Sequence, residues 1–407
     1  MFTSQLDYLV GARWFQGKGL PVRELGWRTL PWYVASGDTW VRSELATLQV
    51  GDSIDTYHLL TGYLAPGTAE QDALICQAEL PGRGLVDVVD APRSPAAMAA
   101  FLSAATGTGC CGITWLEDAP NPAARTQVFS GEQSNTTVII GDDVLFKIFR
   151  RLTPGHNLEA TTLAALARSG ITPRLIGALR AGDEYDLGIF CQRIANAGDG
   201  WEYCVSRCRA GAPIGEDMAR LGQALRVLHA SLADAFGTGT IDAGDVGRQM
   251  IARLDAACLQ APELVASIGP LRRILSLPDG PIPAQRVHGD FHLGQALISS
   301  AGWTIIDFEG EPLKSPDERL AFDSCWRDVA GLCRSLDYVR RSIPGCPDGW
   351  YQDARAGFLR GYANDSPGPL LKAYEVDKAI YELVYETRNR PTWASIPRGA
   401  IQAAIAD

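Results

Sequence analysis

Residues 39–64 alternate apolar and polar side chains on both sides of a Gly-Asp-Ser sequence. This period of two predicts two β-strands joined as a hairpin. The same alternation in residues 128–152 predicts three antiparallel strands, separated by a turn of small polar residues and by a Gly-Asp-Asp turn. Helical spacing marks residues 94–106 and 154–170, and from about residue 195 the pattern is mostly helical. We therefore place the main domain boundary near residue 195.

Two charged residues stand out within this pattern. Lys147 lies between Phe146 and Ile148 on a predicted strand, so it faces the opposite side of the sheet. Glu159 falls in the first turn of the next predicted helix. Each has a simple structural explanation, as a lysine of an edge strand and as a glutamate that favours a helix dipole. The alternative is that the two form an ion pair and that Lys147 points beneath the polar turn.

Composition narrows the class of protein. The 407 residues are 46% hydrophobic and 21% charged, which is typical of a folded chain of two or three domains. A formal net charge of −10 argues against a nucleic-acid surface and against docking on anionic lipid. The N-terminus lacks the pattern of a signal peptide, and no apolar run approaches about 20 residues. We expect a cytoplasmic protein that does not bind membranes, with mostly free thiols among its ten cysteines.

Candidate catalytic side chains are concentrated in residues 286–312, RVHGDFHLGQALISSAGWTIIDFEGEP. Asp290 precedes Gln295 by five residues, a short predicted hairpin follows, and Asp307 comes at the end of its second strand. Kinases use this spacing: an aspartate accepts the proton of the acceptor hydroxyl, and an amide five residues later and a second aspartate hold magnesium. We therefore assign Asp290 as the base and Gln295 and Asp307 as metal ligands.

The same reaction needs groups that bind the phosphates. Lys147 supplies a cation, and backbone amides of the turn at residues 133–136 would cover the phosphates. The turn adds three polar side chains, Ser134, Asn135 and Thr136. Taken alone, the HGD sequence could be an ordinary loop, with His288 and His292 bracing it. The ordered combination of lysine, glutamate, HGD and DFE favours a kinase.

These motifs resemble the aminoglycoside phosphotransferase superfamily, and more closely the bacterial maltokinases and their relatives, which include actinobacterial glucosamine kinases. The similar segments run through nearly the whole chain, from ARWFQGKG through GEQSNTTVI, LFKIFRR, HGDFHLGQ and IDFEGEP to AYEVDKAIYELVYETRNRPTW. One departure is HNLE before the helix glutamate, where maltokinases often have an Asn-Pro-Asp type of start; it hints at a sister group.

The resemblance implies an α+β, eukaryotic protein kinase-like bilobal fold with an additional N-terminal cap. Residues 1–90 would form the cap, 91–195 a β-rich lobe that binds nucleotide, and 196–407 a helical lobe with the catalytic loop and the sugar site. ATP and Mg²⁺ would be the cofactors, with Glu159 as the partner of Lys147. The backbone of Gln192, Arg193 and Ile194 would bind adenine. The residues expected at the sugar are Asp290, Glu309, Tyr381, Glu382, Tyr385, Glu386, Arg388 and Trp393.

The substrate is the least determined part of this interpretation. We expect phosphorylation of glucosamine on its 6-hydroxyl, because a buried ammonium needs a carboxylate and the site offers several. Maltose phosphorylated at its anomeric hydroxyl is the alternative, since maltokinases carry the same acids. An aminoglycoside phosphotransferase and a non-catalytic nucleotide-binding regulator are further alternatives. We expect a small-molecule sugar as the only partner and a monomeric protein.

Overall fold

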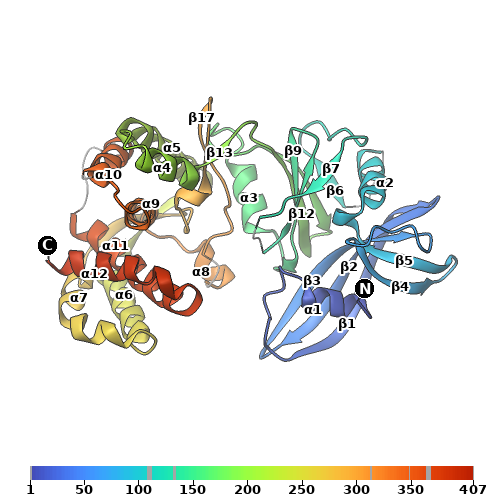
Figure 1. Ribbon diagram of the computed structural model, residues 1–407, viewed down its shortest axis with the longest axis horizontal. Coiled ribbons are helices and arrows are strands. Elements are labelled where there is room, and N and C mark those ends of the chain that lie inside the picture. Colours follow the sequence, from blue (N-terminus) through green and yellow to red (C-terminus); the bar gives the residue numbers. More distant parts are fainter. Residues whose placement is uncertain are drawn as a thin grey trace. The chain divides into compact units, whose positions relative to one another are not determined.

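The computed structural model describes residues 2–107, 112–131, 134–311, 314–347, 349–363 and 368–406. The chain forms two compact units. The first unit consists of residues 1–164 and 173–195, and the second of residues 165–172 and 196–407. Each is described by itself below, with its elements labelled in Figure 1.

The first unit contains two antiparallel sheets. The first sheet has the order β1-β2-β3-β5-β4, and β10 pairs with β3. Its strands are β1 (Val22–Ser36), β2 (Thr39–Val50), β3 (Ser53–Leu64), β4 (Leu74–Leu80), β5 (Gly84–Asp90) and β10 (Arg151–Leu152). The hairpin expected from residues 39–64 is β2 and β3, which pair from Val50 with Ser53 to Trp40 with Tyr63. Gly51 takes a left-handed φ of 58° in its turn, which suits glycine.

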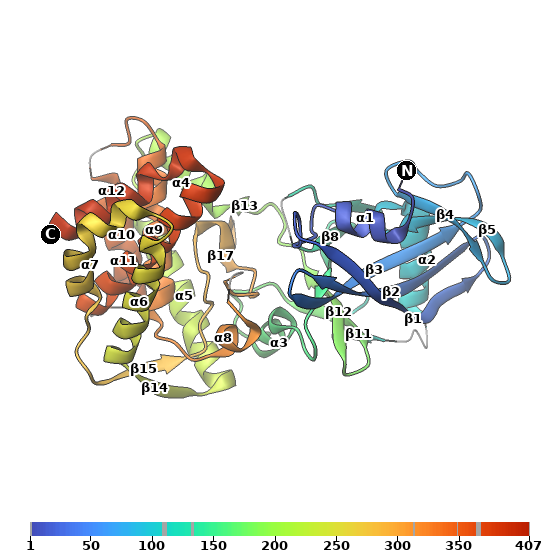
Figure 2. The same cartoon turned by 90° about the horizontal axis from the view of Figure 1, so that it is seen from below.

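Each face of the first sheet is covered by one helix. Alternate residues of β2 and β3, such as Leu48 and Tyr57, pack with Tyr8 and Leu9 of α1 (Gln5–Gly11) (Figure 2). The opposite face contacts α2 (Pro95–Thr106), and a side chain at Gly62 would collide with Ala97 of that helix. The inner parts of β2 and β3 are therefore buried on both faces, whereas no residue of the edge strand β1 is fully buried, and α2 approaches the sheet closely.

The second sheet carries the candidate nucleotide-binding residues. Its order is β6-β11-β12-β9-β8-β7. The strands are β6 (Ile113–Trp115), β7 (Thr126–Val128), β8 (Thr136–Ile140), β9 (Val144–Ile148), β11 (Leu175–Ala181) and β12 (Tyr185–Gln192). Phe146 stacks on Phe190 and on Phe101 of α2, with ring centroids 4.1 and 5.6 Å apart. This aromatic stack fixes one face of β9, so Lys147 lies on the other.

A buried ion pair joins the segments on either side of residue 90. Arg150, which follows β9, donates to both carboxylate oxygens of Asp90 at 2.9 and 3.1 Å. His58 of β3 contacts the Phe149 carbonyl oxygen at 3.1 Å, and its backbone N–H donates to the Arg150 carbonyl. Residues 1–90 thus belong to the same compact unit as β9; their separation as a cap stays a prediction.

The second unit is mainly helical. Its long helices α5 and α10 pack so closely that a side chain at Gly357 or Gly361 would collide with the α5 backbone. The helices are α4 (Gly200–Arg209), α5 (Gly215–Phe236), α6 (Ala243–Cys258), α7 (Ile268–Leu275), α8 (Pro316–Leu320), α9 (Trp326–Ser342), α10 (Trp350–Tyr362), α11 (Gly368–Asn389) and α12 (Ser395–Ala406). Short strands β13 (Gly198–Asp199), β16 (Ala296–Ser299) and β17 (Gly302–Ile305) form one small sheet, and β14 (Thr238–Asp242) pairs with β15 (Pro281–Gln285). The β14–β15 pair was not expected, because its strands are short and contain two prolines.

Candidate active site

Lys147 and Glu159 form an ion pair within the first unit. The Lys147 Nζ lies 2.6 Å from Glu159 Oε2, and both side chains are mostly buried. Lys147 is held by β9, and Glu159 lies in the first turn of α3 (Leu158–Ala165). Asn157 caps this helix, since its side-chain oxygen accepts from the backbone N–H of Glu159 at 2.8 Å and of Ala160 at 3.2 Å. The unusual HNLE sequence therefore supplies a helix cap and leaves the glutamate in reach of Lys147.

The polar turn before β8 accepts two hydrogen bonds from Arg150. Asn135 Oδ1 accepts from the Arg150 backbone N–H at 3.2 Å, and Thr136 Oγ1 accepts from Arg150 Nε at 2.8 Å. Thr136 is buried, whereas Ser134 is exposed and accepts from Asn135 Nδ2 at 3.4 Å. Gln133, the first residue of the predicted turn, lies outside the described residues. These contacts favour a structural role for the Thr136 hydroxyl and leave Ser134 at the surface.

The last residue of β12 and the residue after it already donate their backbone N–H groups to other carbonyls of the first unit. The Gln192 N–H donates to the Arg174 carbonyl at 2.9 Å, and the Arg193 N–H donates to the Asp143 carbonyl at 2.7 Å. Of the three residues expected at adenine, Ile194 is thus the one whose N–H has no protein acceptor within the described part of the chain.

Asp328 of α9 holds the backbone of the catalytic loop by hydrogen bonds. The two Asp328 carboxylate oxygens accept from the backbone N–H groups of His288 and Gly289, at 2.8 and 2.9 Å. Asp328 also pairs with His229 Nε2 at 2.9 Å, and His229 Nδ1 contacts the Tyr362 hydroxyl at 2.8 Å. All these side chains are buried. A charged network from α5, α9 and α10 thereby fixes the HGD sequence.

The loop histidines make contacts within the loop itself. His288 Nε2 lies 3.0 Å from the Ile306 carbonyl, so it is assigned the proton and donates there. His292 Nδ1 accepts from the Gly294 N–H at 3.1 Å at the start of a short 3₁₀ turn, Leu293–Gln295. Both histidines therefore shape the loop between Asp290 and Gln295.

Asp290 has a lysine partner that the sequence did not reveal. The Lys378 Nζ on α11 lies 3.1 Å from Asp290 Oδ1 and 3.7 Å from Glu311 Oε1. Burial by itself would raise the pKa of Asp290, but the charge of Lys378 and the hydrogen bond that Lys378 donates hold it below its usual value. Burial would likewise lower the pKa of Lys378, and the carboxylates of Asp290 and Glu311 raise it instead. Both groups are charged at neutral pH.

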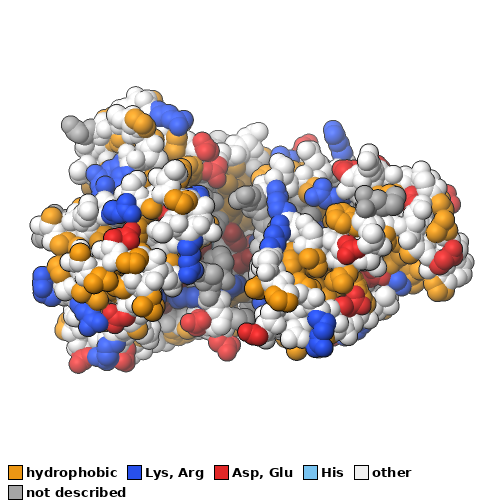
Figure 3. All heavy atoms as spheres, turned by 60° about the horizontal axis from the view of Figure 1, so that its bottom comes forward, with side chains coloured by type: hydrophobic (Ala, Val, Ile, Leu, Met, Phe, Trp, Pro, Cys, Tyr) orange, Lys and Arg blue, Asp and Glu red, His pale blue; other side chains and the backbone are white. Residues whose placement is uncertain are grey.

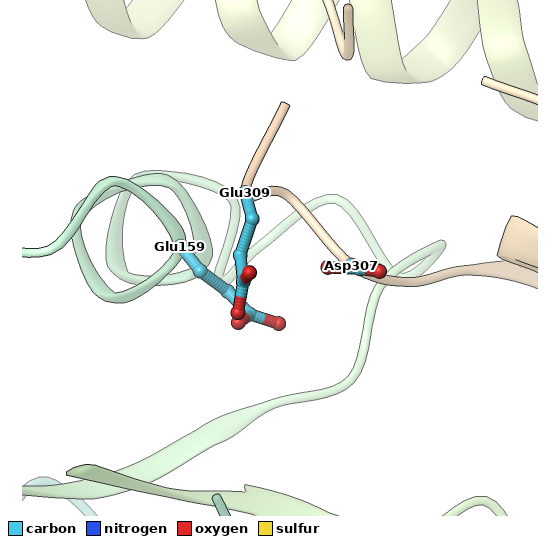
Figure 4. A group of neighbouring side chains, drawn as sticks. All are labelled: Glu159, Asp307 and Glu309. Carbon is cyan, nitrogen blue, oxygen red and sulfur yellow. The ribbon is translucent and has the colours of Figure 1, made fainter. Parts of the chain in front are cut away.

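The two predicted metal ligands lie within hydrogen-bond distance of each other. Gln295 Nε2 donates to Asp307 Oδ2 at 3.0 Å. Asp307 adopts a φ of 64°, which is rare outside glycine and is often found at functional sites. Figure 4 shows Asp307 and Glu309 extending from the same irregular segment after β17, and Glu159 from α3. Carboxylate and amide oxygens are the donors that Mg²⁺ prefers, so the Gln295–Asp307 pair fits that ion when the Gln295 amide turns its oxygen, in place of Nε2, toward it.

The residues predicted at the sugar extend from α11 into the turn Pro391–Trp393. Glu382 accepts from Arg334 of α9 at 2.7 Å, and burial outweighs this cation and raises the pKa of Glu382. Glu386 is buried; its Oε1 accepts from Arg390 at 2.8 Å and from the Tyr338 hydroxyl at 3.3 Å. Within the described residues, its Oε2 has no hydrogen-bond partner.

The aromatic and basic members of this set lie nearer the surface. Tyr381 lies beside Lys378, whose Nζ is 5.0 Å from the ring centroid. Trp393 stacks on Tyr338 at 6.4 Å, whereas Tyr385 and Arg388 are exposed. A sugar role for Arg388 has no supporting contact among the described residues.

Three residues missed in the sequence are Lys378, Arg334 and Asp328. Lys378 precedes Tyr381 and Glu382 by three and four residues, so helical spacing alone places it on their face. For Arg334 and Asp328 the sequence holds no comparable signal, because their partners come from other helices.

On the face shown in Figure 3, acidic and basic side chains are interspersed and no large basic patch is visible. None of the helices in the described ranges is long and apolar enough to cross a membrane.

Residues 125–368 match the model of the phosphotransferase enzyme family, APH, and the chain belongs to that family. It is 30% identical over 309 residues to a glucosamine kinase of Streptacidiphilus jiangxiensis; this alignment covers 65% of this chain and 70% of that kinase. It is 24% identical over 336 residues to a glucosamine kinase of Mycolicibacterium smegmatis; this alignment covers 72% of this chain and 83% of that kinase.

A solved glucosamine kinase in complex with glucosamine, ADP and inorganic phosphate has the same fold. It aligns with a TM-score of 0.69 at 22% identity and covers 99% of both chains. The resemblance to phosphotransferases and the kinase-like α+β fold class are therefore confirmed. The chain is an enzyme of the ATP-dependent sugar kinase type.

Proposed function

We propose that this protein transfers the γ-phosphoryl group of Mg-ATP to the 6-hydroxyl of glucosamine. The observation that carries the substrate is the similarity of most of the chain to two glucosamine kinases. The charged, lysine-paired Asp290 and the Gln295–Asp307 pair provide the catalytic groups for that transfer.

The first unit binds the nucleotide in this proposal. Lys147, oriented by Glu159, contacts the phosphates, and the turn with Ser134 and Asn135 covers them. Since Gln192 and Arg193 already donate to backbone carbonyls, the Ile194 N–H is the donor left for adenine. The Thr136 hydroxyl, which accepts from Arg150, supports the turn without contacting phosphate.

Asp290 acts as the base. Lys378 occupies its Oδ1, and within the described residues Oδ2 has no hydrogen-bond donor. Oδ2 is therefore the oxygen that accepts the proton of the sugar hydroxyl. Since the pKa of Asp290 is held low, the carboxylate is ionised before the sugar binds and orients the hydroxyl toward the phosphate.

Gln295 and Asp307 would hold Mg²⁺ through the amide oxygen and the carboxylate. The metal would neutralise charge on the phosphates during transfer. His288 contacts the Ile306 carbonyl next to Asp307, and His292 accepts from the Gly294 N–H next to Gln295. These two contacts hold both metal ligands in position relative to Asp290.

Glu386 is the carboxylate that we assign to the ammonium of glucosamine. Asp290 pairs with Lys378 and Glu382 with Arg334, and the side chains of both cations are mostly buried, whereas the cation beside Glu386 is the exposed Arg390. Glu386 combines a buried carboxylate with an oxygen that has no partner within the described residues. A buried carboxylate oxygen favours a cationic ligand strongly. Tyr381 and Trp393 would pack against the sugar ring, and Glu309 and Tyr385 would contribute at its edge.

The test is ADP release from Mg-ATP with glucosamine, N-acetylglucosamine, glucose, maltose and kanamycin. We expect turnover on glucosamine, with the phosphate on the 6-hydroxyl by phosphorus and carbon NMR. Turnover on maltose alone would identify a maltokinase, and turnover on kanamycin alone an aminoglycoside phosphotransferase. No turnover on any of them would favour the regulatory alternative. The monomeric state and the cytoplasmic location stay predictions.

Within this assay Glu386→Gln isolates the ammonium site. It should lower kcat/KM for glucosamine on the order of 10-fold or more, because a charged hydrogen bond is lost. Its effect on glucose, which lacks the ammonium, should be small. Equal losses on both sugars would assign Glu386 a structural role.

A further inference from the structure

Cys208 and Cys346 bring two thiols together from distant parts of the second unit. Cys208 is the second-last residue of α4, and Cys346 lies in the turn between α9 and α10. Their sulfur atoms are 2.9 Å apart, although the residues are 138 positions apart in the chain. A disulfide has sulfur atoms about 2.05 Å apart, so closing this gap needs a shift of less than about 1 Å.

We propose that Cys208 and Cys346 form a reversible disulfide when the protein meets hydrogen peroxide. This thiol pair is a modification site made of residues that take no part in the proposed phosphoryl transfer. The sequence expectation of free thiols holds for the reduced protein, in which eight cysteines of the described ranges are unbridged.

The two cysteines have different roles in the oxidation. Burial and the neighbouring Cys346 raise the pKa of Cys208 to about 12, so Cys208 is a poor initial nucleophile. Cys346 is partly exposed, so peroxide reaches it first. Its thiolate attacks one peroxide oxygen, the O–O bond breaks, and the departing hydroxide takes up the proton lost by the thiol to give water. The product at Cys346 is a sulfenic acid.

The second step uses the adjacent thiol. The Cys208 sulfur attacks the sulfenic sulfur, the S–OH bond breaks, and the hydroxyl leaves as a second water with the Cys208 proton. Two thiols thus lose two electrons, and one hydrogen peroxide becomes two waters. The 2.9 Å separation allows this step to compete with further oxidation of Cys346.

The disulfide would tie α4 to the segment that leads into α10. The first residue of α4, Gly200, packs so closely on the catalytic loop that a Cβ would lie 2.6 Å from the Leu293 and Ala296 carbonyl oxygens. A bond at the other end of α4 would therefore restrain a helix that supports Gln295. It would also close a long loop, which stabilises the folded chain by restricting the unfolded one.

The experiment treats the full-length reduced protein with a few equivalents of hydrogen peroxide, blocks remaining thiols with N-ethylmaleimide, and maps disulfides by mass spectrometry. We expect a linked Cys208–Cys346 peptide, its loss on treatment with dithiothreitol, and a thermal midpoint higher by several degrees in the oxidised protein. Cys346→Ser should abolish the linked peptide and the shift. Because Cys346 is partly exposed, this variant should fold normally.

Cys258→Ser is the matched control, because Cys258 is also partly exposed but has no thiol beside it among the described residues. It should form the Cys208–Cys346 link as the wild type does. Two outcomes would overturn the proposal: both cysteines remain fully blocked by N-ethylmaleimide after peroxide, or either one is found linked mainly to another cysteine. Neither outcome depends on which sugar the enzyme phosphorylates.

Discussion

Each unit contains one lysine–carboxylate pair at a candidate catalytic position, and the two pairs differ in how the chain builds them. Lys147 and Glu159 are 12 residues apart and meet at 2.6 Å through one strand and the helix that follows it. Lys378 and Asp290 are 88 residues apart and meet at 3.1 Å only when α11 packs against the catalytic loop. The first pair is a product of local structure, and the second depends on the whole helical unit.

This difference has an electrostatic consequence. Lys147 pairs with Glu159 of the neighbouring helix, whereas Lys378 lies near both the base Asp290 and Glu311, and Glu311 in turn pairs with Arg327 at 2.5 Å. A change at Lys378 should therefore alter the ionisation of a base. A change around Lys147 should alter mainly nucleotide binding and the stability of α3.

The largest effect is expected for Asp290→Asn. The amide cannot accept the proton of the acceptor hydroxyl, so kcat should fall by about 10²–10⁴-fold. ADP affinity, measured by calorimetry, should change less than about 2-fold, because Asp290 is not assigned to the nucleotide. Unchanged turnover would remove Asp290 as the base.

The next effect concerns stability and the network that anchors the catalytic loop. Burial would lower the pKa of His229, but its hydrogen bond to Asp328 raises it to about 9. The folded protein therefore keeps the proton that the unfolded chain releases near pH 6.5. The stabilisation from this group is fully present below pH 6.5 and is lost as pH rises through about 9, by about 3 kcal/mol.

Urea unfolding at pH 6.5 and pH 9 measures this loss. In His229→Gln the fall in unfolding free energy between the two pH values should be smaller than in the wild type. The same fall in both proteins would show that His229 does not bind the extra proton.

The third effect separates the role of Lys378 from simple packing. In Lys378→Met, Asp290 loses its cation and its pKa rises, so the acid limb of the kcat–pH profile should move to higher pH. Turnover at pH 8 should fall on the order of 10-fold from lost orientation of the base, and further at lower pH. Lys378→Arg should restore the position of the acid limb.

Lys372→Met is the matched control, on the same helix but with no ion pair among the described residues. It should keep both kcat and the acid limb of the wild type. An unshifted acid limb in Lys378→Met, together with reduced stability, would make Lys378 a packing residue only.

The contrast between the pairs also explains what the sequence could predict. The period of two through residues 39–64 and 128–152 predicted the strands, and the position of Lys147 between Phe146 and Ile148 predicted its face. Family motifs predicted Asp290, Gln295 and Asp307, and the fold class followed from the resemblance. These are properties of neighbours in the chain or of a shared pattern.

The rest depended on packing between elements far apart in the chain. Lys378 lies in a helix whose pattern shows which residues share a face but not which loop that face meets. The anchoring of the HGD sequence needs Asp328 and His229 from two other helices. Glu386 could be named as a candidate, but only the structure shows that Arg390 and Tyr338 occupy one oxygen and leave the other for a ligand.

The smallest effect tests the local pair through the cap of its helix. Asn157→Ala removes the acceptor for the N–H groups of Glu159 and Ala160 and should lower the unfolding free energy by about 1 kcal/mol. Because the cap fixes the turn that carries Glu159, KM for ATP should rise about 2- to 3-fold while kcat at saturating ATP stays near wild type. Asn157→Ser, which keeps a side-chain acceptor, should recover most of both losses. If the alanine variant were less stable but bound ATP normally, the Lys147–Glu159 pair would not depend on the cap, and strand β9 alone would suffice to place the lysine.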